Sequence, residues 1–244
     1  MLASQAENLS DVWHRVTGVQ NQPPPWLVAA TAAAALLLVL YPLAWRLSRN
    51  AVTIAHEGGH ALAALVTGRK LTGIRLHSDT SGVTVSRGRP SGPGMVLTAF
   101  AGYTTPPLLG LAAAALLGVG RLTAVLWISL ALLAAILLLI RNAFGVVSVV
   151  VTGGVIFAVS WYGSEQVQAA FAYFAAWFLL AGGVRPVFEL QRLRWQGRAP
   201  QSDADQLSRL TGVPAILWVG LFGVVALGSF AAGCYLLAAP LLKA

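Results

Sequence analysis

Two histidines and a glutamate occupy five consecutive positions of the chain, in the segment His56-Glu57-Gly58-Gly59-His60. Residues four apart lie on one face of an α-helix, so on a helix His56 and His60 can bind the same metal ion. Glu57 then points in a neighbouring direction, where it can take a proton from a metal-bound water. Zinc lowers the pKa of such a water to about 7, which makes hydroxide available at neutral pH. This HExxH pattern therefore predicts zinc-dependent hydrolysis with Glu57 as the general base.

The composition around this motif is that of a membrane protein. Of the 244 residues, 57% are hydrophobic and only 10% are charged, against roughly 45–50% and 25% in soluble domains. These fractions disfavour a disordered chain, a coiled coil and an ordinary soluble enzyme. Because the apolar residues come in blocks, and a helix of roughly 20 apolar residues spans a bilayer, the sequence predicts an all-α polytopic membrane protein.

About seven transmembrane helices are predicted, or six if the shortest apolar segment does not span. The segments cover about 26–45, 50–67, 95–118, 122–140, 143–162, 167–183 and 213–238. The second carries the HExxH motif, and a charged residue at the centre of a membrane helix costs about 2.5–3.5 kcal/mol. A glutamate between two histidines there favours a functional site. The structural alternative is a polar face that hydrogen-bonds to neighbouring helices.

Basic residues set the predicted orientation of these helices. With seven alternating spans, most Lys and Arg residues fall on one side, which should be cytoplasmic. Residues 1–25 then form a cytoplasmic N-terminal segment, and the C-terminus lies outside. The net charge of +8 sits in short loops beside apolar segments, which indicates contact with the head groups of the lipid bilayer rather than nucleic acid. The single cysteine, Cys234, cannot build a thiolate metal cluster.

Two segments outside the spans have patterns of their own. Residues 71–88 contain two strand-like stretches around a Ser-Asp-Thr-Ser-Gly turn, which predicts a β-hairpin directly after the HExxH helix. An exposed edge of this hairpin could pair with an unwound substrate segment; a surface hairpin without substrate contact is the alternative. Residues 185–212 form a predicted cytoplasmic loop that begins with a short interfacial helix. Within it, Ser202 followed by Asp205 matches a helix capping box.

The segment 55–69, AHEGGHALAALVTGR, resembles the site-2 protease class of intramembrane zinc metalloproteases, and within that class the bacterial M50B-like branch. A hairpin with Gly-Val-Thr follows, as in that class. Residues 100–106, FAGYTTP, look like the family's AGP-type segment, and residues 202–205, SDAD, look like a pattern of the branch. The resemblance covers most of residues 50–220. It implies a single membrane-embedded M50-like domain over residues 26–244, Zn²⁺ as cofactor, membrane-associated protein substrates and a place in the bacterial plasma membrane.

One departure from the family concerns the third zinc ligand. Site-2 proteases usually take it from an Asp in an LDG-type segment of a later span, where this chain has Arg141–Gly145 without a carboxylate. Asn142 offers only an amide oxygen, so hydrogen bonding or helix capping suits it better. Asp203 and Asp205 are the best placed acids if their segment folds back. Because Asp205 is needed by the capping box, Asp203 is the predicted third ligand. The alternatives are that both acids only stabilise a helix N-terminus, or that His77, read here as a strand residue, is a ligand.

These observations favour a zinc-dependent intramembrane endopeptidase that hydrolyses peptide bonds of transmembrane or membrane-associated proteins. The alternative is a non-catalytic protein that keeps the protease scaffold and binds transmembrane partners, and the missing LDG carboxylate favours it. An ion or metal transporter is a third class. It would normally show intramembrane polar residues on several spans, whereas here the clear cluster lies on one.

Overall fold

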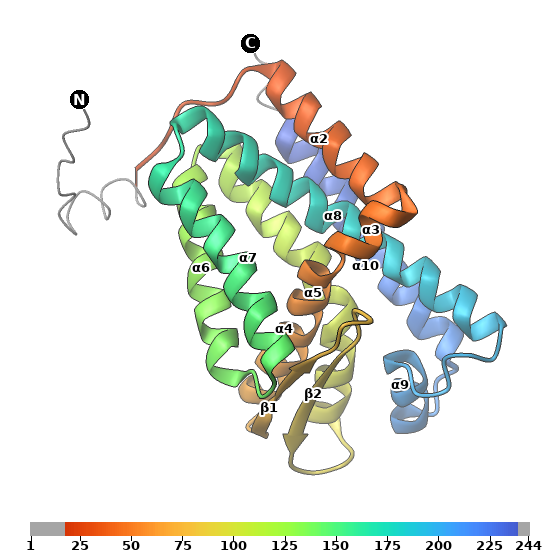
Figure 1. Ribbon diagram of the computed structural model, residues 1–244. Helices are drawn as coiled ribbons and strands as arrows, with labels where there is room; N and C mark the ends of the chain where they lie inside the picture. The colour runs from red at the N-terminus through yellow and green to blue at the C-terminus, as the bar shows by residue number, and fades with distance from the viewer. Residues whose placement is uncertain (1–17, 239–244) are drawn as a thin grey trace.

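The computed structural model describes residues 18–238, which form a bundle of apolar helices with one small sheet at its lower end (Figure 1). In chain order the elements are α2 (Pro25–Leu40), α3 (Pro42–Ser48), α4 (Asn50–Val66), β1 (Lys70–Leu76), β2 (Gly82–Arg87), α5 (Pro93–Gly118), α6 (Leu122–Leu139), α7 (Ala143–Tyr162), α8 (Glu165–Trp195), α9 (Asp203–Thr211) and α10 (Ala215–Ala238). The prediction of a mostly helical chain with long apolar helices and one hairpin is confirmed.

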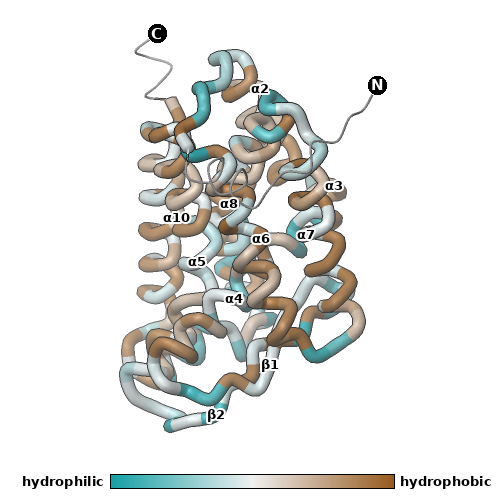
Figure 2. The backbone as a smooth tube through the Cα atoms, turned by 90° about the vertical axis from the view of Figure 1, so that its left-hand side faces the viewer, coloured by the Kyte–Doolittle hydropathy of each residue, from teal (hydrophilic) through white to brown (hydrophobic). Residues whose placement is uncertain are grey.

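Five helices, α5, α6, α7, α8 and α10, are long and apolar enough to cross a membrane. The helices α2 and α3 pass the same test together, as one span with a bend of 96°. Hydrophobic residues recur along α6, α7 and α10 (Figure 2), and exposed side chains such as Leu138, Val147 and Leu217 make the outer faces of these helices apolar. Such a surface suits lipid tails, so the described part of the chain has five candidate spans, or six with the bent pair.

The seventh predicted span is not shown, because α2 and α4 do not run in opposite directions. Pro42 disfavours a helical conformation at the residue before it, and Tyr41 is accordingly extended, with φ −75° and ψ 119°. The chain turns sideways through α3 and then continues in α4 toward the hairpin end (Figure 1). Gly182 of α8 lies against Trp45 of α3 and Val52 of α4, which places this break well inside the bundle. Before the hairpin, the described residues therefore show one bent candidate span rather than two separate ones.

The segment before α2 lies at the end of the bundle opposite the hairpin. The backbone N–H of Gln20 donates to the carbonyl of Gly120 at 2.8 Å, and the Gln22 side chain donates to the carbonyl of Leu117 at 3.0 Å. The sequence prediction placed residues 1–25 and the hairpin on one side, because it counted two crossings between them. Residues 18–24 lie at the opposite end of the bundle from the hairpin, residues 1–17 lie outside the described part of the chain, and the side of the membrane that this segment faces stays a prediction.

The hairpin forms as predicted, with β1 and β2 antiparallel and Ile74 opposite Thr84. The outer edge of β1 is covered by the chain between α6 and α7. Ile140 forms a parallel bridge with Ile74, and the backbone N–H of Arg141 donates to the carbonyl of Ile74 at 2.9 Å. Within residues 18–238 no strand pairs with the outer edge of β2, so β2 carries the open edge of this sheet.

The predicted short helix at the start of the 185–212 segment is continuous with α8, which runs for 31 residues and includes Pro186. Glu189 on this extension accepts hydrogen bonds from the Trp45 indole at 2.9 Å and from Arg185 at 2.8 Å, and it forms an ion pair with Arg49 at 3.2 Å. These contacts fasten the extension of α8 to the break between α2 and α4.

The short helix α9 folds back against α5 and α10, beside the hairpin end of the bundle (Figure 1). Ser202 caps its N-terminus by accepting the backbone N–H of Asp205 at 3.3 Å, which confirms the predicted cap. Arg194 of α8 forms an ion pair with Asp205. Ala204 and Leu207 are fully buried against the bundle, so α9 is held by its apolar face and by charge.

Candidate metal centre

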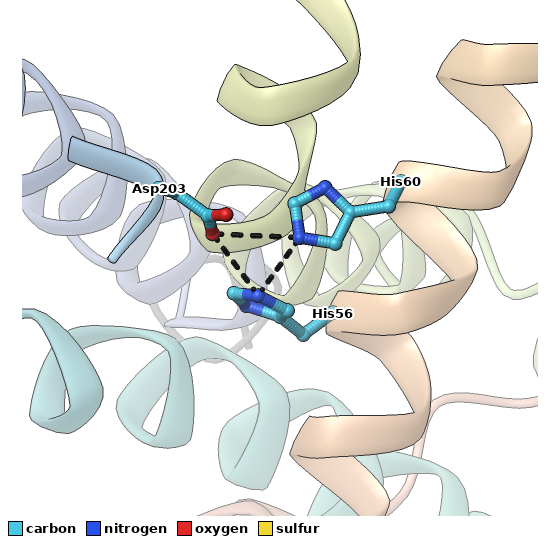
Figure 3. Close-up of side chains that lie close together, drawn as sticks. All are labelled: His56, His60 and Asp203. Carbon is cyan, nitrogen blue, oxygen red and sulfur yellow. Dashed lines mark hydrogen bonds and ion pairs between the residues drawn. The ribbon is translucent and has the colours of Figure 1, made fainter. Parts of the chain in front are cut away.

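Three potential metal ligands from distant parts of the chain meet at the hairpin end of the bundle (Figure 3). His56 and His60 lie one turn apart on α4, and their Nε2 atoms are 3.1 Å apart. An Oδ2 atom of Asp203, the first residue of α9, lies 3.2 Å from Nε2 of His56 and 3.4 Å from Nε2 of His60. The predicted third ligand thus lies beside both histidines, while its role as a ligand stays a prediction.

These spacings fit a zinc ion. Zinc–nitrogen and zinc–oxygen bonds of about 2.0–2.1 Å in a tetrahedron separate neighbouring ligand atoms by about 3.3 Å. The three observed separations, 3.1, 3.2 and 3.4 Å, bracket that value. Two imidazole nitrogens with one carboxylate oxygen are also a donor set that zinc accepts, with a fourth position left for water or substrate. The residues present therefore fit the metal that the HExxH motif implies.

A hydrogen bond from α5 orients His60. Its Nδ1 atom lies 2.7 Å from the carbonyl oxygen of Thr98, and a carbonyl can only accept, so Nδ1 carries the proton. Nε2 is then the ring nitrogen that faces His56 and Asp203. Such partners commonly fix the tautomer and ring orientation of metal-binding histidines.

The backbone of α5 approaches the two imidazoles closely at Gly102. A Cβ atom at this position would lie 2.5 Å from Nε2 of His60 and 2.6 Å from Nε2 of His56, so a side chain there would displace both rings. The next residue, Tyr103, contacts the His56 ring edge to face at a centroid separation of 4.9 Å. The close approach of α5 to the two imidazoles therefore requires the small residue Gly102 in the FAGYTTP segment.

Glu57 is buried beside the three grouped residues, with 4% of its surface exposed. Its Oε2 atom accepts a hydrogen bond from the Thr84 hydroxyl of β2 at 2.7 Å. Gly82, also on β2, lies so close that a Cβ there would be 2.6 Å from Oε1 of Glu57. The hairpin thus holds the carboxylate that the motif assigns as general base, and a cavity of about 380 Å³ opens beside it.

The electrostatics of Asp203 suit a ligand role. Burial by itself raises its pKa, but the adjacent His60 and the hydrogen bonds from both histidines outweigh this and hold the pKa well below its usual range. The carboxylate is therefore ionised at neutral pH.

The other residues that the sequence offered as ligands lie elsewhere. Asp205 is bound to Arg194 and Ser202. The Asn142 side chain pairs with both backbone groups of Leu76, at 3.2 and 2.7 Å, and so extends the edge of β1. His77 contacts Ser81 at the tip of the hairpin.

Sequence reasoning missed the contacts that hold these groups. No sequence pattern assigns Thr84 or the carbonyl of Thr98 to the site. The Gly-Val-Thr stretch was the available signal for Thr84, but only the strand register shows that it reaches Glu57.

Comparison with known proteins gives a family for the chain. Neither a curated protein nor a solved structure matches it. A family model described as Peptidase M50B-like matches residues 29–233, a range that includes α4, the hairpin and α9 and covers most of the chain. The protein therefore belongs to the Peptidase M50B-like family.

Proposed function

We propose that this protein is a zinc-dependent intramembrane endopeptidase that cleaves membrane-associated protein substrates. The observation that carries the proposal is the meeting of His56, His60 and Asp203 at separations matching a tetrahedral zinc site. Membership of a peptidase family supports the same chemistry.

Each residue of the site has a distinct role in the proposed reaction. His56 and His60 would hold the metal through Nε2, and Asp203 would hold it through a carboxylate oxygen. A zinc ion held there would act as a Lewis acid and lower the pKa of water, so that hydroxide would be available at neutral pH. Glu57 would accept a proton from the attacking water at a carboxylate oxygen and then donate it to the leaving amine. Thr84 orients Glu57 by donating to Oε2.

The open edge of β2 is the proposed docking site for substrate. A transmembrane helix hides its peptide bonds, so it must unwind before hydrolysis. An extended segment can pair with the free N–H and C=O groups of an edge strand, and Thr84 places this edge beside Glu57. The hairpin would thus supply both the docking site and the orientation of the general base.

Replacing Glu57 with Gln tests the proposal. The change removes the proton acceptor but none of the three proposed ligands, so we expect cleavage to stop while zinc stays bound in equimolar amount. Purified protein in lipid nanodiscs would be measured for zinc content and for cleavage of single-span substrates. The control is Asp79→Asn, at the hairpin turn away from the metal-binding group.

Cleavage that survives Glu57→Gln would contradict the assignment of the general base. Zinc that stays bound after His56→Ala would contradict the ligand set. A wild-type protein that binds zinc and membrane substrates without cutting them would instead favour the non-catalytic alternative.

A further inference from the structure

Arg69 is a cation at the wall of the 380 Å³ cavity beside Glu57. Its Nε atom donates to the Ser86 hydroxyl at 3.0 Å, and its Nη1 atom donates to the carbonyl of Arg89 at 2.6 Å. Among the residues that the structure describes, no carboxylate lies within ion-pair distance of it. A guanidinium has five N–H donors, so Arg69 keeps further donors for a ligand.

The remaining charges at this cavity belong to the proposed metal centre. The ionisable groups that line it, apart from Arg69, are His56, Glu57, His60 and Asp203. Among the described residues, Arg69 is therefore the charged lining group left to recognise a substrate. A guanidinium pairs best with a carboxylate, through charge and through parallel hydrogen bonds.

The strand β2 fixes how far Arg69 lies from the reacting bond. Its inward residues contact the site in order, with Thr84 bonded to Glu57 and Ser86 bonded to Arg69. Residues two apart on a strand are separated by about 6.8 Å. A substrate strand on the open edge that has its reacting bond level with Thr84 therefore has a residue two positions away level with Ser86.

We propose that Arg69 is a specificity-determining residue that selects substrates with an Asp or Glu side chain two residues from the cleaved bond. The proposal rests on the proposed peptidase function. It deepens that function by naming a chemical feature of the substrate.

The test uses full-length protein in phospholipid nanodiscs with zinc. The probes are single-span Leu/Ala helices with a Gly-containing stretch near one end, in which one Glu or one Gln is moved residue by residue. Cut sites and rates are read by mass spectrometry. We expect the Glu-to-Gln rate ratio to peak at about fivefold when the residue is two positions from the cut.

Four variants separate charge from structure. Arg69→Gln should bring the ratio to about one, Arg69→Lys should keep most of it, and Arg69→Glu should reverse it in favour of a Lys-bearing probe. The matched control is Arg87→Gln, at an outward-facing, exposed position of β2, which should keep the wild-type ratio.

A wild-type ratio near one at every position, or a ratio that Arg69→Gln leaves unchanged, would overturn the proposal. If the wild-type protein cleaves no probe, the peptidase function fails by itself. Binding of the same Glu and Gln probes, measured by fluorescence anisotropy, then decides: a Glu preference lost in Arg69→Gln supports the role of Arg69, and equal binding overturns it.

Discussion

At the scale of single residues, the proposed metal centre depends on the lack of a side chain at Gly102 as much as on the ligands. The imidazoles of His56 and His60 lie where a Cβ at Gly102 would have to be. Contacts of 2.5–2.6 Å are far below van der Waals distance, and packed interiors relax only partly around such an intrusion. Gly102 therefore sets how closely α5 can support the two rings.

We expect Gly102→Ala to lower zinc affinity by about tenfold or more, because the added methyl displaces both imidazoles. Zinc affinity would be measured by competition with a chromophoric chelator. Gly154→Ala is the matched control, since a Cβ at Gly154 meets nothing within 4 Å. Equal zinc affinity in the two variants would contradict this account.

Asp203 gives a second prediction at this scale. Its carboxylate is the one anionic group among the three grouped residues, so Asp203→Asn removes the charge while keeping the shape. We expect zinc affinity to fall by at least about 100-fold, since loss of a mere supporting partner already costs about 10–100-fold. The same chelator competition measures it. If Asp203→Asn binds zinc as the wild type does, Asp203 serves only the N-terminus of α9.

At the scale of elements, α9 must be docked for Asp203 to reach the histidines. The buried residues Ala204 and Leu207 and the Arg194–Asp205 ion pair hold it against the bundle. Asp205 also accepts from the Ser202 hydroxyl at 2.5 Å, so one carboxylate joins the helix cap to α8. Residue Asp203 is thereby positioned through its neighbours.

Arg194→Gln should weaken this docking and lower zinc affinity by about tenfold, the lower end of the effect of outer-shell partners. Arg192→Gln, two residues away on the same helix and exposed, should leave zinc affinity unchanged. Thermal unfolding of both variants without zinc separates local docking from global stability. A normal zinc affinity in Arg194→Gln would show that the apolar face of α9 suffices.

Elements were predictable from sequence to the extent that their signals are local. Apolar blocks gave the helices, the Ser-Asp-Thr-Ser-Gly turn gave the hairpin, and HExxH placed two ligands on one helix. Asp203 was reached by elimination among few acids, because no local pattern encodes the return of α9 to α4. The Tyr41-Pro42 step does encode the break after α2. Residues 26–45 are nevertheless apolar throughout, so hydropathy alone predicts one unbroken span there.

At the scale of the whole molecule, a single interrupted crossing before the hairpin would change which ends of the bundle share a side of the membrane. Gln20 and Gln22 lie beside the α5–α6 turn, and the hairpin and α9 lie at the other end (Figure 1). The basic hairpin end remains the one expected to face the cytoplasm. We therefore expect the segment before α2 to face away from the cytoplasm, contrary to the orientation that seven spans imply.

Single cysteines test this orientation in a Cys234→Ser background, which removes the one native thiol. We expect Asn21→Cys and Gln166→Cys to react with a membrane-impermeant maleimide from the same face, and Ser91→Cys from the opposite face. Labelling of intact cells and of inverted vesicles gives the readout. If Asn21→Cys instead labels together with Ser91→Cys, α2 and α4 cross separately and the seven-span count holds.

The distance along the chain between His60 and Asp203 has a consequence for biosynthesis. Chains emerge from the ribosome N-terminal end first, so the HExxH helix is made well before α9. Under the proposed ligand set, a growing chain has two of its three ligands until the segment after α8 has been made and has folded back. Hydrolytic competence would then arise only near the end of synthesis, which would protect the nascent chain and its neighbours from premature cutting.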